Sequence, residues 1–222
     1  MFRLVVVAAA LILPGCASVQ QIPMNPSSAE TLKHKEIALS ERAKPDFAAT
    51  TPSRGAFGMI GAGVTISEGN KLIREHGIED PALYIGKALA WDLQDRYHTR
   101  LSPKGAPTAS DEVDEVVKNA NGADLVLDVR TLNWSFVYYP TSWGKYRVIY
   151  SARLRLVDVK NGTVLAEGGC ARVPAQSDGA PSYGELIANS AARLKQELRI
   201  AAEHCISEFK SKTLAVSLQQ AH

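Results

Sequence analysis

Cysteine and histidine are the residue types in this 222-residue chain that could supply a nucleophile or a metal ligand. The histidines are His34, His76, His98, His204 and His222. No two of them are spaced as H-x-x-x-H, and none has a cysteine at ligand spacing, so the sequence predicts no metal site. His204 adjoins Cys205, but neighbouring helix positions point about 100° apart and do not face each other.

Other catalytic patterns are absent from the sequence. It contains no G-x-S-x-G elbow and no P-loop. The acidic residues at positions 111–115 lack the glycine-centred spacing of a calcium loop, and they suit the first turn of a helix instead. We therefore expect no enzyme activity and no cofactor.

Cys16 follows a short apolar run behind a basic start. Arg3 precedes ten apolar residues at positions 4–13, which is signal-peptide length, whereas a membrane span needs about 20 residues. Residues 13–16, Leu-Pro-Gly-Cys, resemble the lipobox of bacterial lipoproteins, in which a peptidase cleaves before a cysteine whose thiol carries diacylglycerol. The resemblance implies that residues 1–15 form a signal peptide and that Cys16 anchors the chain to a membrane by its lipid.

The residues after Cys16 predict where and how the chain is held. In enterobacterial lipoproteins an aspartate at the next position favours the inner membrane, so by resemblance Ala17 implies the inner leaflet of the outer membrane, facing the periplasm. Residues 16–33 are rich in Ser, Gln and Pro and predict a flexible tether. Such a tether could reach at most about 55 to 60 Å. We expect a single domain at residues 34–213 and a tail at 214–222.

The composition indicates an ordinary globular domain, with 45% apolar and 22% charged residues. A net charge of +2 creates no field that would attract nucleic acid, so we expect no nucleic-acid partner. The expected contacts are the membrane, through the lipid, and an envelope protein. The oligomeric state is not predicted.

The secondary-structure pattern predicts an α+β fold. Helices are expected from Asp80-Pro81 to near Arg100, over residues 110–121 and over residues 183–210. Strands are expected over residues 35–42, 123–139, 146–159 and 163–173, the last two joined by an Asn161-Gly162 turn. We expect an antiparallel sheet of three to four strands, with helices packed on one face and a long C-terminal helix.

The expected strand at 123–139 carries a phase change and leads into an aromatic hairpin. Its apolar residues occupy odd positions up to Val129 and even positions from Leu132, which predicts a bulge or a strand that extends beyond the sheet. The residues that we predict to contact a partner or ligand are Trp134, Phe136, Tyr138, Tyr139, Trp143, Tyr146 and Arg147. The alternative is a local cluster that covers the end of the sheet. The basic residues Arg147, Arg153 and Arg155 could recognise an anionic glycan or partner, and the alternative for them is pairing with Asp128 across the sheet.

The two cysteines left after Cys16 is assigned to lipid predict a disulfide in an oxidising compartment. Cys170 shares strand parity with small apolar residues, and Cys205 lies on the apolar stripe of the C-terminal helix. We therefore expect the Cys170 and Cys205 thiols to face each other and to bond.

Two segments resemble known envelope proteins. Residues 122–127 (Gly-Ala-Asp-Leu-Val-Leu) and the hairpin at 156–165 are similar to segments of the TolB N-terminal domain and of curli-secretion-channel lipoproteins. They cover only a small part of the chain, and the resemblance implies a fold more than a function. The whole chain also resembles proteobacterial envelope lipoproteins, which implies no activity.

Two functions remain open from the sequence. The first is a non-catalytic envelope lipoprotein that acts as an assembly or accessory factor through protein contacts. The second is a binding module for cell-wall glycan or lipid, which requires a concave site near the aromatic hairpin.

Overall fold

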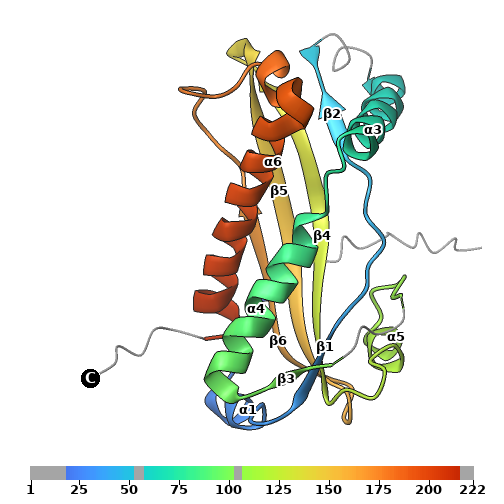
Figure 1. Ribbon diagram of the computed structural model, residues 1–222, viewed down its shortest axis with the longest axis vertical. Helices are drawn as coiled ribbons and strands as arrows, with labels where there is room; N and C mark the ends of the chain where they lie inside the picture. The colour runs from blue at the N-terminus through green and yellow to red at the C-terminus, as the bar shows by residue number, and fades with distance from the viewer. Residues whose placement is uncertain (1–18, 53–57, 103–106, 216–222) are drawn as a thin grey trace, which may run out of the picture.

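The computed structural model describes residues 19–52, 58–102 and 107–215, with only the backbone of residues 58–62. These residues form an α+β domain around one six-stranded sheet (Figure 1). The predicted fold class is confirmed. Strand β1 (Glu36–Leu39) lies within the strand expected over residues 35–42 and pairs in parallel with β4 (Leu125–Tyr139). The additional strands are β2 (Ala48–Thr50), which pairs with another part of β4, and β3 (Arg100–Leu101), which pairs with β1. Five strands follow the order β3-β1-β4-β5-β6, with β5 at Ser142–Asp158 and β6 at Thr163–Arg172, and β2 lies beside β4 off this path.

The antiparallel part of the sheet is a meander of three long strands. They are β4 (Leu125–Tyr139), β5 (Ser142–Asp158) and β6 (Thr163–Arg172). The register of β4 against β5 shifts between Thr131 and Asn133, where the sequence predicts a bulge. Val129 before the shift and Trp134 after it both lie in the main core. The extra residue of the bulge therefore keeps the apolar side chains of β4 on one face of the sheet.

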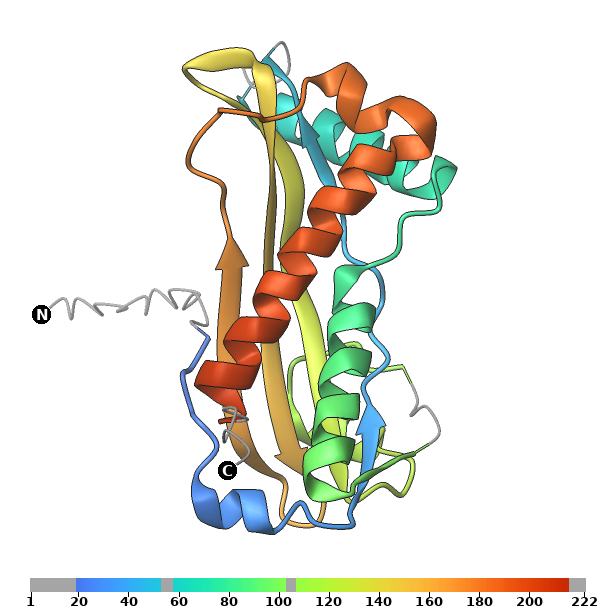
Figure 2. The same ribbon diagram turned by 60° about the vertical axis from the view of Figure 1, so that its left-hand side comes forward.

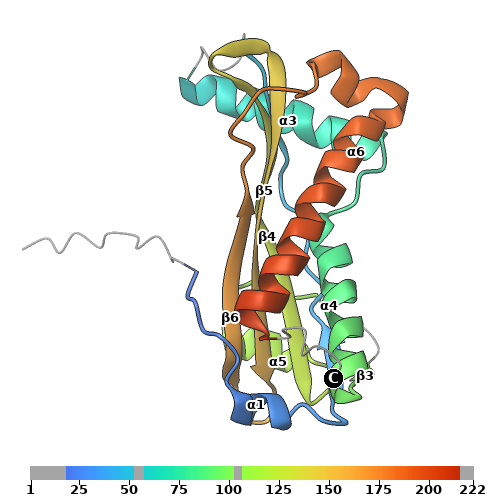
Figure 3. The same ribbon diagram turned by 90° about the vertical axis from the view of Figure 1, so that its left-hand side faces the viewer.

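Two long helices cover that apolar face (Figures 2 and 3). They are α4 (Pro81–Tyr97) and α6 (Tyr183–Glu208), and the π-helix η1 (Phe209–Thr213) continues α6. Asp80 caps α4 and Ser182 caps α6. Helix α4 ends three residues before the expected position, because His98 adopts a left-handed conformation with φ 55°.

The helices are not confined to one face of the sheet. Helix α5 (Val113–Lys118) packs against the opposite face, where Val116 meets Val126 and Val157 in a second, smaller apolar cluster. This face is also where Asp128 lies, between Val126 and Arg130 on alternate positions of β4.

Helix α3 (Gly58–Glu75) and strand β2 pack closely at one end of the molecule (Figure 1). A Cβ atom at Gly69 would lie 2.0 Å from the Phe47 carbonyl oxygen, so only glycine allows this helix to approach the chain entering β2. The sequence pattern predicts neither element.

The segment before β1 lies against the domain, and the prediction of a flexible tether over residues 16–33 is wrong for residues 19–33. Ile22 exchanges two backbone hydrogen bonds with Glu167 of β6, and the Met24 N–H donates to the Thr213 carbonyl oxygen at 2.8 Å. Met24 and Leu32 are buried, and α1 (Pro26–Glu30) lies between them. Single apolar residues in a polar stretch have no periodicity, so the sequence gives no signal of this docking.

The predicted boundaries fall partly outside the described residues. The signal peptide, Cys16 and Ala17 lie there, as does most of the expected tail, although Leu214 is buried in the domain. No helix within the described ranges is long and apolar enough to cross a membrane.

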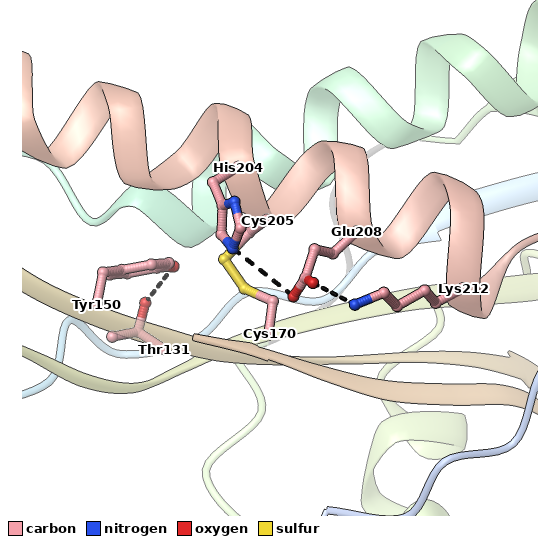
Figure 4. The surroundings of a disulfide bond; sticks show 7 residues. All are labelled: Thr131, Tyr150, Cys170, His204, Cys205, Glu208 and Lys212. Atoms are coloured by element: carbon pink, nitrogen blue, oxygen red, sulfur yellow. Dashed lines mark hydrogen bonds and ion pairs between the residues drawn. A yellow bond between two sulfur atoms is a disulfide. The ribbon is translucent and has the colours of Figure 1, made fainter. Parts of the chain in front are cut away.

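The structure joins Cys170 of β6 to Cys205 of α6 by a disulfide, as expected (Figure 4). Their Cα atoms are 5.4 Å apart, within the range that a disulfide spans without backbone movement. Both residues are buried in the main core. His204 instead points toward Glu208, with its Nε2 atom 3.8 Å from the carboxylate, so it forms no thiol–imidazole pair with Cys205.

Candidate functional site

The aromatic residues predicted as a contact surface are mostly core residues. Trp134, Phe136, Tyr139 and Tyr146 are each 5% exposed or less. The prediction of a contact residue is therefore wrong for Trp134 and Phe136, whereas Tyr139 and Tyr146 line the pocket described below. Phe136 and Tyr146 pack edge to face, with Tyr183 of α6 beside both rings. The bulge in β4 is the reason, because it turns the even-numbered aromatic positions toward the helices.

Trp143 is the exception among these aromatics. It lies at the β4–β5 hairpin tip, its side chain is 67% exposed, and its indole N–H donates to the Pro140 carbonyl oxygen at 2.7 Å. Tyr138 is half-buried and packs against the core. The accessible part of the predicted surface is therefore the tip itself.

Arg153 and Arg155 do not lie with Arg147. They pair with Asp128 on the α5 side of the sheet, the alternative left open by the sequence. Asp128 is fully buried and also accepts two hydrogen bonds from Arg42 and one from Ser40. Asp111, next to α5, receives hydrogen bonds from Arg130 and Arg153. This network holds the segment before α5 on the sheet.

Arg147 instead lines a pocket at the other end of the sheet. Beyond the end of β6, the edge of β5 is covered by the loop at residues 173–181, which the Tyr146 N–H fixes by donating to the Pro181 carbonyl oxygen at 2.8 Å. The pocket lies between this loop, the β5 edge and α6, and its volume is about 310 Å³. That volume is at the lower end of the range for small-molecule sites.

Three arginines from three different elements line this pocket. Arg172 of β6 and Arg193 of α6 each bond one oxygen of the Glu197 carboxylate, at 3.3 and 2.8 Å. Both oxygens of Glu197 are therefore occupied, and each of the two guanidinium groups keeps further N–H donors.

Arg147 has no carboxylate partner among the described residues. Its guanidinium carbon lies 5.3 Å from the centre of the Tyr139 ring, and its guanidinium donates a 3.4 Å hydrogen bond to the Pro174 carbonyl oxygen. The buried Nε atoms of Arg147 and Arg193 lack a hydrogen-bond partner within the described ranges, as does the Nε atom of Arg153 beside Asp128. Unsatisfied buried donors are costly unless a bound group accepts from them.

Tyr139 supplies a neutral hydroxyl at the pocket wall. Burial raises the pKa of the Tyr139 hydroxyl, although Arg147 and Arg172 oppose the effect by attraction for the phenolate. The hydroxyl therefore stays protonated at neutral pH, and it donates to the Pro174 carbonyl oxygen at 3.3 Å. This bond helps to hold the loop in place.

Two other cavities are less suited to recognition. A cavity of about 90 Å³ between α4 and β1 has mainly apolar walls and room for little more than a few waters. A groove of about 370 Å³ between α4 and α6 has Tyr84 and Arg199 in its wall. These two side chains bond each other and the Glu203 carboxylate at 2.5 to 2.9 Å, so both already have polar partners.

Sequence reasoning found one of the three arginines of the pocket. Arg147 stood out because it adjoins the aromatic hairpin, whereas Arg172, Arg193 and Glu197 are separated from it by 25 to 50 positions. No local motif links them, since only the packing of α6 beside β6 brings them together. Within the described parts of the chain, no three His, Cys, Asp or Glu side chains are grouped to hold a metal ion.

Known proteins resemble this chain in structure and not in sequence. No protein-family model and no curated protein matches it. Similar solved structures include the PelC dodecamer from Paraburkholderia phytofirmans, at 15% identity and a TM-score of 0.39, covering 89% of this chain and 97% of that one. The lipoprotein GNA1162 from Neisseria meningitidis has 14% identity, a TM-score of 0.28 and coverage of 73% and 96%.

A third similar structure is a putative neuraminyllactose-binding hemagglutinin homolog from Helicobacter pylori. It has 12% identity and a TM-score of 0.32, and the match covers 88% of this chain and 87% of that one. At such values the likeness concerns the arrangement of secondary structure alone. None of these three structures is the TolB domain, so they do not support the resemblance to it.

Proposed function

We propose that this protein is a membrane-anchored envelope lipoprotein that works by binding and not by catalysis, with the arginine-lined pocket as its binding site. We define this pocket by Arg147, Arg172, Arg193, Glu197 and Tyr139. The observation that carries the proposal is a concave site next to the aromatic hairpin, containing a guanidinium without a carboxylate partner. A binding module for cell-wall glycan or lipid requires such a concave site.

Photocrosslinking in intact cells tests the proposal. A photoreactive residue at Gln176, on the exposed rim of the pocket, is expected to capture a glycan or a protein of the envelope. The matched control is the same residue at Lys118, which is exposed on α5 at the other end of the sheet. No adduct at Gln176, or equal adducts at both positions, would contradict a binding site in the pocket.

The membrane anchor is tested separately at Cys16. Wild-type protein is expected to incorporate a palmitate analogue during growth, because the thiol of Cys16 is the proposed attachment point. Cys16→Ala should lose the label and leave the membrane fraction or remain unprocessed. A wild-type protein without label would refute the anchor, while leaving the pocket untouched.

The exposed Trp143 favours a second candidate, in which the hairpin tip binds a protein and the lipoprotein acts as an assembly factor. Aromatic residues are enriched at interface hot spots because they bury a large area at a small cost in side-chain entropy. A tryptophan that is 67% exposed at the end of a long hairpin is available for such a contact.

Trp143→Ser should weaken protein capture from native membranes without changing the melting temperature by more than about 1 to 2 °C, since an exposed side chain contributes within about 0.5 kcal/mol. Trp91→Ser is the matched control, because Trp91 is 59% exposed on α4, away from the tip. Equal capture by the two variants would exclude the tip as the contact.

A further inference from the structure

The charges of the arginine-lined pocket leave room for one more negative group. Three arginines line it, and the only acidic residues in its wall are Glu197 and Asp178. The net charge of these five side chains is +1. A monoanion would complete this balance, whereas a phosphate dianion would bring an excess negative charge close to the two carboxylates.

Arg147 has the geometry to receive that group. A guanidinium carries five N–H donors in a planar fork, and Arg147 uses one of them in a long bond to Pro174. Its position by the Tyr139 ring restrains the plane of the fork, and its Nε atom is buried without a partner. A planar carboxylate matches such a fork with two parallel hydrogen bonds.

The rest of the wall offers partners for hydroxyl groups. Gln176 supplies an amide that donates and accepts, and Asp178 supplies a carboxylate that accepts. Both belong to the loop at 173–181 and are exposed at its rim. A ligand with a carboxylate at one end and hydroxyl donors around it is an acidic sugar.

We infer that the arginine-lined pocket binds the carboxylate of a uronic acid unit in an acidic glycan, with Arg147 as the carboxylate-binding residue. This inference rests on the proposed function, since it names the ligand of the same pocket. The hydroxyl groups of the sugar then face Gln176 and Asp178, and Arg193 adds positive charge to the pocket wall.

Calorimetric titration of the full chain in detergent with trigalacturonate tests this assignment. Binding is expected for the wild type, and Arg147→Gln should weaken it about tenfold or more because a charge-assisted, two-bond contact is lost. Arg147→Lys keeps the charge but not the fork, so it should also bind more weakly than the wild type. Arg100→Gln, an exposed arginine on β3, is the matched control and should bind normally.

Three further probes decide the ligand class. Maltotriose, which lacks the carboxylate, should not bind, and inorganic phosphate and a glutamate tripeptide should bind more weakly than trigalacturonate. Nitrogen NMR of the arginine side chains should show the Arg147 Nε–H signal shifting on titration, while the Arg153 Nε–H signal stays in place, because Arg153 lies six positions further along β5, beside Asp111 and Asp128.

Several outcomes would overturn the inference. They are no binding of trigalacturonate, unchanged binding by a folded Arg147→Gln variant, equal binding of maltotriose, or preferred binding of phosphate or peptide. The proposed function fails on different evidence, namely the absence of an adduct at Gln176 in cells. An adduct with another ligand there would leave the binding function standing without the uronate.

Discussion

Asp128→Asn should destabilise the protein by about 3 to 5 kcal/mol, because it leaves buried guanidinium groups without their counter-charge. Asp128 is 0% exposed, and the Arg42 and Arg155 side chains are 8% and 6% exposed. Arg42 bonds both carboxylate oxygens at 2.9 Å, and Arg155 bonds one of them at 2.8 Å. Chemical denaturation at pH 7 measures the loss.

The matched control for this change is Asp95→Asn. Asp95 is exposed near the end of α4, so its loss of charge should alter the free energy of unfolding by about 0.5 kcal/mol or less. A loss of stability below about 1 kcal/mol in Asp128→Asn would show that water reaches the cluster and replaces the carboxylate.

The stability of the wild type at acid pH should also depend on the Asp128 carboxylate. Burial would raise the pKa of Asp128, but the hydrogen bonds and charge of Arg42, with hydrogen bonds from Ser40 and Arg155, outweigh it and lower the pKa from 3.8 to about 2. The folded state therefore binds this proton more weakly than the unfolded state. The resulting stability, about 2 kcal/mol, is present above pH 4 and is lost as the pH falls toward 2.

Comparison of the two proteins isolates this contribution. Between pH 4 and pH 2, Asp128→Asn should lose less unfolding free energy than the wild type, by about the same 2 kcal/mol. Parallel acid profiles for the two proteins would mean that the carboxylate is not ion-paired in the folded state.

Loss of the Cys170–Cys205 disulfide should be the second large effect. The bond closes a loop over a sequence separation of 35, and removing it restores denatured-state entropy worth roughly 3 to 4 kcal/mol in the chain-entropy model. For a domain of this size, the melting temperature should fall by about 10 °C. Calorimetry of oxidised and reduced protein measures the fall.

The variant with both Cys170→Ala and Cys205→Ala is the control. It should melt near the reduced wild type and show no further change with reductant, since Cys16 takes no part in the bond. Because both sulfurs are buried, the folded wild type should react with maleimide only after unfolding and reduction. Rapid labelling of Cys170 or Cys205 in unreduced native protein would refute the bond.

The sequence predicted the long elements because their patterns repeat over many residues. The alternation from Tyr146 onward and the Asn161-Gly162 turn give the β5–β6 hairpin, and the phase change near Leu132 gives the bulge. Strand β2 has only three residues, and α3 begins in a glycine-rich stretch, so neither carries a periodic signal. Their positions depend on contacts such as Gly69 against Phe47.

The candidate site was predictable only in part, for a related reason. Alternation shows that Phe136 and Tyr146 share a face, but it does not show that α6 extends far enough to cover them. From the sequence alone, the aromatic side chains could therefore equally form a contact surface or part of the core. Arg147 was visible as a basic residue beside them, whereas its lack of a carboxylate partner depends on where Glu197 and Asp128 lie in the fold.

The docked N-terminal segment limits the volume around the membrane anchor that the domain can reach. With the lipid on Cys16, as proposed, only two residues separate the anchor from Val19, which packs over Gly169 of β6. This link reaches about 10 Å, against the 55 to 60 Å of a free tether, so the volume that the domain sweeps is smaller by on the order of a hundredfold. The domain is then held close to the membrane, and its effective concentration toward a partner there rises accordingly.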